Sequence, residues 1–277
     1  MRDIELLVLG SGGPFAQPSR ASSSYVVFSQ GQPRLPVDCG GGAFERLGRA
    51  GVDPGALGTV LLTHTHADHT GGLPAVVFAS VMAGGAAPLT VVGPAGRDQH
   101  PGCRHFTDLL FGPSGAWSYL HTFDGFGIDA HEVASDPGQA QVRDVLSLPG
   151  LTVRAVAVSH GMMPSLAYRI DSADAALVLS GDVDGASPGL VELARGADLL
   201  VHDMALPERD VPHGGLHAKP RQVGRTAASA GVRALLLTHV MPELEDEREV
   251  AEQQVRTAYP GPVSWAHDPL RIPVRGR

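Results

Sequence analysis

The chain has 277 residues and a formal net charge of −8, and its composition, 43% hydrophobic and 18% charged, is ordinary for a folded globular protein. Its first residues show neither a signal peptide nor an apolar run long enough to span a membrane, so we expect a cytoplasmic protein. The two cysteines, Cys39 and Cys103, lie far apart, which argues against a disulfide framework and against a separate zinc knuckle.

Strand and helix patterns alternate along the chain without an obvious linker. Short apolar runs bounded by Gly or Pro indicate buried strands, and longer runs with helical spacing indicate helices. In chain order, the sequence predicts a helix over residues 42–51, a strand over 59–63, a helix over 72–82, strands over 151–160 and 175–182, a helix over 219–231, a strand over 233–239 and a helix over 245–259.

The loop after the strand at residues 59–63 is the most informative stretch of the sequence. It reads His64-Thr65-His66-Ala67-Asp68-His69 and holds four side chains that can bind metals within six residues. Imidazoles and carboxylates suit zinc and similar cations. A strand that ends in a turn can point His64 and His66 toward one ion and Asp68 and His69 toward a second.

One loop cannot complete two metal sites, so further ligands must come from elsewhere. Three other predicted strands end in such residues, namely His160, Asp182 and His239. Because the candidate ligands are spread from residue 64 to residue 239, we expect one cooperative domain covering residues 1–277. The sequence therefore predicts a metal centre assembled at the ends of several strands.

The order of these residues resembles the metallo-β-lactamase fold superfamily over nearly the whole chain. Within it, the sequence is most similar to the branch of ribonuclease Z and related phosphodiesterases and arylsulfatases. Residues 7–13 resemble the first strand and glycine turn of that branch, and residues 167–169 are similar to its Gly-Tyr-Arg. Asp203 and the later His217 resemble an acidic residue and a second histidine that form a pair in that branch. The resemblance implies an α/β fold, an αββα sandwich.

The resemblance also implies a role for each candidate ligand. Two divalent ions would be bound, with zinc expected first and manganese or iron as alternatives. They would share a bridging hydroxide and polarise a phosphoryl or carbonyl oxygen. One ion would be held by His64, His66 and His160, the other by Asp68, His69 and His239, and both by Asp182.

Three further roles concern catalysis. Asp68 could also orient the hydroxide, and His217, held by Asp203, would donate a proton to the leaving oxygen. The alternative for His217 is an ordinary surface histidine in a Gly- and His-rich loop. His202 is interpreted as a buried structural histidine, and Asp38 as a buried carboxylate beneath the metal site.

Residues 96–149 fit the pattern least well and are interpreted as an insertion. The aromatic part, residues 106–126, could form a lid over the metal centre, a contact in a homodimer, or plain packing. Six of the chain's aromatic residues lie there: Phe106, Phe111, Trp117, Tyr119, Phe123 and Phe126.

The charge distribution argues for a small ester as the substrate, although it does not exclude a nucleic acid. Residues 14–20 contain one arginine and no lysine, and only about twenty residues separate His160 from Asp182, where ribonuclease Z enzymes carry basic segments. Binding of nucleic acids depends largely on Lys and Arg. The basic residues Lys219, Arg221, Arg225 and Arg233 are interpreted as a solvated helix face.

We therefore expect a metal-dependent hydrolase of a small phosphodiester. The alternatives are an arylsulfatase or lactonase with the same centre, a ribonuclease Z that processes the 3′ end of transfer RNA, and a binding module without turnover. An iron-loaded redox protein is less favoured, because the chain shows no flavin-binding domain.

Overall fold

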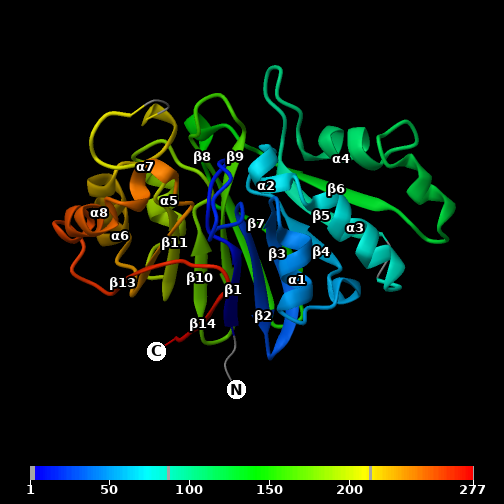
Figure 1. Ribbon diagram of the computed structural model, residues 1–277, viewed down its shortest axis with the longest axis horizontal. Coiled ribbons are helices and arrows are strands. Elements are labelled where there is room, and N and C mark those ends of the chain that lie inside the picture. The colour runs from blue at the N-terminus through cyan, green and yellow to red at the C-terminus, as the bar shows by residue number, and fades with distance from the viewer. Residues whose placement is uncertain (1–3, 86–87, 212–213, 277) are drawn as a thin grey trace.

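The computed structural model describes residues 4–85, 88–211 and 214–276. In these ranges, two sheets of seven strands lie against each other, and helices cover the outer face of each (Figure 1). The first sheet has the order β14 (Leu270–Val274), β1 (Ile4–Gly10), β2 (Ser24–Ser29), β3 (Gln32–Cys39), β4 (Thr59–Leu61), β5 (Leu89–Pro94) and β6 (Ile128–Val133). The second has the order β13 (Val263–Trp265), β12 (Leu235–Thr238), β11 (Leu199–Asp203), β10 (Ala176–Leu179), β9 (Ser165–Asp171), β8 (Leu151–Val158) and β7 (Arg143–Leu148).

Strands near the middle of each sheet are buried on both faces, which explains their nearly continuous apolar sequences. In β1, Leu6 and Val8 belong to the core between the sheets, whereas Leu7 and Leu9 belong to the core beneath the helices of the first sheet. This alternation is the period-two pattern of a strand. A third cluster lies between the second sheet and its own helices.

The helices fall into two groups. The first sheet is covered by α1 (Ala43–Arg49), α3 (Leu73–Met82) and α4 (Cys103–Phe111), and the second by α5 (Pro188–Leu193), α6 (Pro220–Ala230) and α8 (Arg248–Arg256). Two single-turn helices, α2 (Ala67–Thr70) and α7 (Pro242–Glu245), lie at the end of the sandwich opposite the chain termini in Figure 1. The predicted αββα sandwich is thus confirmed.

The structure differs from the predicted elements mainly in detail. The helix predicted over residues 245–259 is shorter, beginning at Arg248, and the one-turn α7 precedes it. Four short 3₁₀ helices occupy Pro54–Ala56, Ser118–Thr122, Pro137–Gln139 and Gly214–Leu216. No helix in the described ranges is long and apolar enough to cross a membrane.

The aromatic segment at residues 106–126 packs against the first sheet. Phe111 is buried, and Phe106, Trp117, Phe123 and Phe126 pack against the same outer core as α1 and α3. Tyr119 remains half exposed against the ring of Phe78. These contacts favour plain packing among the three interpretations of this segment, and the homodimer stays a prediction.

Tyr168 of β9 joins the two sheets through its hydroxyl. The side chain is fully buried, and the hydroxyl donates to the carbonyl oxygens of Leu62, at 2.9 Å, and Val92, at 3.3 Å, in the first sheet. Leu62 directly precedes the loop that carries His64 and His66. The hydrogen bond therefore fixes the spacing of the sheets beside the candidate site.

Replacing Tyr168 by Phe is expected to lower the free energy of unfolding by about 1–2 kcal/mol, because two buried carbonyls lose a donor while the ring remains. Urea denaturation at fixed metal content measures the change. The matched control is Tyr119→Phe, whose side chain is 49% exposed, and which should stay within about 0.5 kcal/mol of the wild type. Equal stability of the two variants would show that the Tyr168 hydroxyl contributes nothing.

Candidate metal centre

The candidate ligands meet where strands of both sheets end. Strands β10, β11 and β12 run parallel, so their carboxyl ends lie at one edge of the second sheet. From this edge come Asp182 after β10 and His239 after β12, and His160 follows β8. The first sheet contributes the loop after β4 and the start of α2. Every predicted ligand is therefore held by a segment that leaves a buried strand.

The first group of ligands contains three histidines from two sheets. The Nε2 atom of His64 lies 3.0 Å from Nδ1 of His66, and Nε2 of His160 lies 3.4 Å from the same atom. Asp182 Oδ2 lies 3.8 Å from His64 Nε2 and 3.6 Å from His160 Nε2. Four donor atoms thus surround one point, which is the geometry of a metal site.

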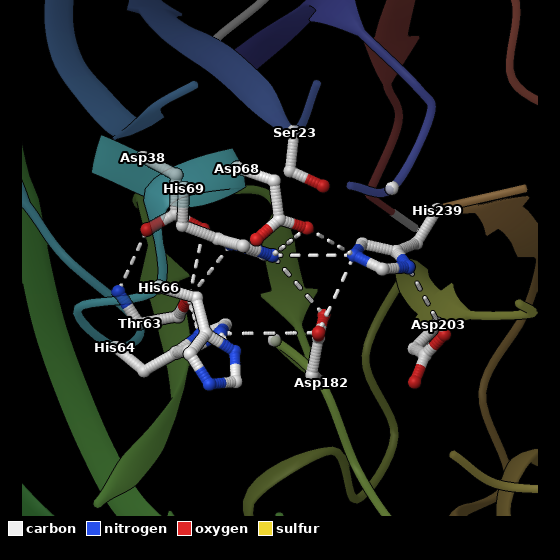
Figure 2. A network of polar contacts seen from close by, with 12 residues as sticks. Ser23, Asp38, Thr63, His64, His66, Asp68, His69, Asp182, Asp203 and His239 are labelled. Carbon is white, nitrogen blue, oxygen red and sulfur yellow. Dashed lines mark hydrogen bonds and ion pairs between the residues drawn. The ribbon is translucent and has the colours of Figure 1, made fainter. Parts of the chain in front are cut away.

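The second group lies on the other side of Asp182 (Figure 2). The Nε2 atoms of His69 and His239 are 3.2 Å apart, and Asp68 Oδ2 lies 3.3 Å from that of His239. Asp182 reaches this group as well, with Oδ1 3.4 Å from His69 Nε2 and Oδ2 3.3 Å from His239 Nε2. Asp182 therefore contacts both groups, as the predicted bridging ligand should.

The protonation of His64, His66 and Asp182 suits cations. Burial lowers the pKa of His64 well below its usual value and also lowers that of His66, so both imidazoles are neutral and can offer a lone pair. Burial acts to raise the pKa of Asp182, but His239 and His69 outweigh it, and the pKa lies well below the usual range. Asp182 is therefore a carboxylate at neutral pH.

Several observations indicate that the donor set fits two divalent ions. Two pairs of imidazole nitrogens lie 3.0–3.2 Å apart, close enough for both nitrogens of a pair to bind one ion. A cavity of about 20 Å³, room for one ion or water, is bounded by His69, Asp182 and His239, among others. His239 itself adopts a strained backbone with φ of 60°. Strain of this kind is found where the surroundings impose a functional geometry.

A further carboxylate, Asp38 at the end of β3, fixes the first-sheet ligands. Its Oδ2 accepts hydrogen bonds from His69 Nδ1 at 2.7 Å and from the hydroxyl of Thr63 at 2.8 Å, and its Oδ1 accepts from the backbone N–H of Thr63. The Thr63 hydroxyl lies 3.1 Å from Nδ1 of His64. These bonds set the orientation of both rings, a common support of metal-binding histidines. The predicted place of Asp38, beneath the metal site, matches this geometry.

Two glycines allow the strands to come close at the centre. Gly181, with φ of 59°, precedes Asp182, and a Cβ there would lie 2.9 Å from the carbonyl oxygen of Leu166. A Cβ on Gly13 would lie 2.8 Å from Cε1 of His239. Both positions therefore require glycine, for conformation in one case and for space in both.

Asp203, at the end of β11, contacts two histidines. Its Oδ2 accepts a hydrogen bond of 2.7 Å from His217 Nδ1, and its Oδ1 lies 3.8 Å from Nδ1 of His239. Burial acts to lower the pKa of His217, but the Asp203 carboxylate outweighs it and raises the pKa to about 9. His217 is 5% exposed, so the alternative of an ordinary surface histidine is wrong for its position.

Neighbouring His202 differs from His217. It is fully buried, and its Nδ1 donates to the backbone carbonyl of Asp203 at 2.7 Å. Burial lowers its pKa, so the ring is neutral. It lines none of the described cavities, in agreement with a structural role.

A pocket of about 380 Å³ lies over the centre. His66, Asp68, His160, Asp182, His217 and His239 form its floor. Its other described walls come from loops and short helical turns: Pro14, Phe15, Ala67, Leu206, Leu216, Met241 and Glu243. A substrate in this pocket would therefore touch both candidate ligand groups and His217 at once.

The sequence did not reveal Thr63, Phe15 or Glu243. Thr63 is an ordinary strand residue, and its contact with Asp38 spans 25 residues. Phe15 lies in a loop and Glu243 in the one-turn helix α7; both line the pocket, and no spacing rule connects them. The nearest signal was position, since Thr63 precedes the first ligand and Glu243 follows the last by four residues.

Comparison with known proteins agrees with this architecture. Residues 34–240 match the family described as "Beta-lactamase superfamily domain". The chain is 32% identical over 290 residues to "Ribonuclease Z" of Mycobacterium bovis (strain BCG / Pasteur 1173P2), and the match covers 99% of each chain.

Two solved structures share the fold. Human tRNase Z, short form, superimposes with a TM-score of 0.75 at 22% identity, covering 98% of this chain and 99% of the other. The metallo-β-lactamase fold protein YhfI from Bacillus subtilis gives a TM-score of 0.75 at 22% identity, covering 97% and 98%. The chain therefore belongs to the metallo-β-lactamase superfamily and is a metal-dependent hydrolase of the branch that contains ribonuclease Z.

Proposed function

We propose that this protein hydrolyses a phosphodiester with two divalent ions as cofactors, zinc being the first candidate. The observation that carries the proposal is the convergence of six donor residues around a seventh, Asp182, next to the pair of His217 and Asp203. The first ion would be held by His64, His66 and His160, the second by Asp68, His69 and His239, with Asp182 serving both.

Each part of the site would have a separate task. Bound ions would make a nucleophile from water at neutral pH and would polarise the phosphoryl oxygen. Asp68 has a side chain that is 10% exposed and lies at the floor of the pocket, where it can accept a hydrogen bond from the attacking water. Its pKa, which burial acts to raise, is lowered by the hydrogen bond from His239, so it remains an acceptor.

His217 would supply the proton that the leaving oxygen needs. Asp203 accepts from Nδ1, which leaves Nε2 as the atom available to a substrate in the pocket that His217 lines. The pKa of about 9 keeps this nitrogen protonated at neutral pH. Bound cations would lower that pKa toward the range in which a general acid transfers its proton efficiently.

Two substrate classes follow from different observations. The name shared by the sequence relatives supports cleavage of RNA, as in 3′ processing of transfer RNA, and makes it the first substrate to test. The small ester expected from the sequence has no such support from relatives. It is favoured by one feature of the structure, because no Lys or Arg is among the described residues that line the pocket.

The deciding experiment compares a precursor transfer RNA carrying a 3′ trailer with bis(p-nitrophenyl) phosphate, p-nitrophenyl sulfate and a simple lactone. Purified protein with a measured content of zinc or manganese is used throughout. Cleavage of the precursor at one position supports the RNA substrate, and cleavage of the small diester alone supports the second class. Turnover of the sulfate or lactone without any diester cleavage would contradict the proposal.

Substitution Asp182→Ala is expected to reduce the bound metal below two ions per chain, because both ligand groups lose a shared carboxylate. Hydrolysis of the diester should fall by more than the roughly 10- to 100-fold that loss of an indirect partner costs. Metal analysis and steady-state kinetics measure both effects. The control is Asp129→Ala, whose side chain is 52% exposed in β6. Two bound ions and full activity in Asp182→Ala would exclude the bridging role.

Substitution His217→Ala should preserve both ions and slow cleavage by about 100-fold or more for alkyl leaving groups, which need a proton. Cleavage of p-nitrophenyl esters should change much less, because p-nitrophenolate leaves without one. A leaving-group series under saturating metal measures the difference. The matched control is His131→Ala, an exposed histidine of β6. An equal loss across the series would rule out proton donation by His217.

A further inference from the structure

The outer part of the pocket is mostly apolar but contains one carboxylate. Phe15, Leu206, Leu216 and Met241 provide carbon surface, and Glu243 in α7 provides the charge. Its Oε2 atom is inaccessible to solvent and has no hydrogen-bond donor among the described residues. A buried carboxylate oxygen without a donor is unfavourable.

Two other acids of the same stretch are paired with arginines. Glu245 lies 3.1 Å from Arg20, and Glu247 lies 2.8 Å from Arg209. Glu243 is the acid of this stretch that lines the pocket and lacks an arginine. Because an unpaired carboxylate in a mostly apolar wall favours a cation beside it, the missing partner indicates what the substrate carries.

We infer that Glu243 selects a phosphodiester whose alcohol arm ends in a cationic nitrogen, such as an alkylammonium group. The inference rests on the proposed function and narrows its second substrate class. With the phosphoryl group between the two ligand groups, the arm would extend along the apolar wall toward Glu243. The ammonium would pair with the partly exposed Glu243 carboxylate rather than with its enclosed Oε2 atom, and the ring of Phe15 offers a second favourable surface.

The same charge would reject other substrates. An arm that carries a second phosphate or a carboxylate would bring like charges together in a poorly solvated wall. A neutral alkyl arm would leave Glu243 without a donor. The pocket would therefore rank substrates by the charge of the arm, in the order cationic, neutral and anionic.

Three esters of p-nitrophenyl phosphate that differ only in the arm test this order: 3-aminopropyl, butyl and 3-carboxypropyl. All release p-nitrophenolate, so the chemical step is matched. For the metal-loaded wild type, we expect kcat/KM for the aminopropyl ester to exceed that of the butyl ester by about 10-fold or more, mainly through KM. The carboxypropyl ester should be the poorest substrate.

Variants of Glu243 show whether the carboxylate is the cause. Glu243→Gln should bring the ratio of aminopropyl to butyl ester close to one, and Glu243→Lys should favour the carboxypropyl ester. Glu249→Gln is the matched control, since it removes the same charge from an exposed position of α8 and should keep the wild-type ratio. Thermal melting and metal content establish that each variant is folded and loaded.

The outcomes separate the two proposals. A wild-type ratio near one, or a ratio unchanged in Glu243→Gln, would overturn the role of Glu243 while leaving phosphodiester hydrolysis intact. If the loaded wild type hydrolyses none of the three esters but cleaves the precursor transfer RNA, the ammonium-bearing substrate class is wrong. If it cleaves no diester of any kind, the proposed function itself fails and the inference falls with it.

Discussion

The carboxylate of Asp182 is the contact on which the arrangement of the centre depends. Its Oδ1 lies 3.4 Å from His69, and its Oδ2 lies 3.3 Å from His239 and 3.6 Å from His160. These histidines come from both sheets, so the side chain of Asp182 contacts segments that are far apart in sequence. For it to reach them, Gly181 must adopt a left-handed backbone, and the two sheets must keep the spacing that Tyr168 helps to set.

The sequence was sufficient to predict the fold and the positions of the candidate ligands, for a physical reason. Residues that end a buried strand must lie where the strands of the sheet end. The position of a histidine there, such as His160 or His239, is therefore largely fixed. Contacts that depend on distances between loops could not be predicted. Thr63 beneath the ligands and Glu243 in the pocket wall have no sequence pattern, because their neighbours come from segments that only folding brings together.

The candidate metal ligands and the residues of the outer pocket wall differ in how firmly they are held. Most of the candidate ligands are buried. Asp38 and Thr63 hold the rings of His69 and His64 by hydrogen bonds, and Asp203 Oδ1 lies 3.8 Å from Nδ1 of His239. Phe15 comes from a surface loop and Glu243 from the one-turn helix α7, and Oε2 of Glu243 has no hydrogen-bond donor among the described residues. A change in these segments can therefore alter which substrate binds with little effect on the chemistry below.

The position of Asp203 has a thermodynamic consequence. One carboxylate faces Nδ1 of His217 through Oδ2 and Nδ1 of His239 through Oδ1. The negative charge of Asp203 attracts both a proton on His217 and an ion at His239, so their binding equilibria are linked. Such linkage is reciprocal. The free energy by which an ion at the second site weakens proton binding at His217 equals the free energy by which that proton weakens binding of the ion. Binding of the ion would then ease loss of the proton from His217, and loss of that proton would in turn tighten binding of the ion.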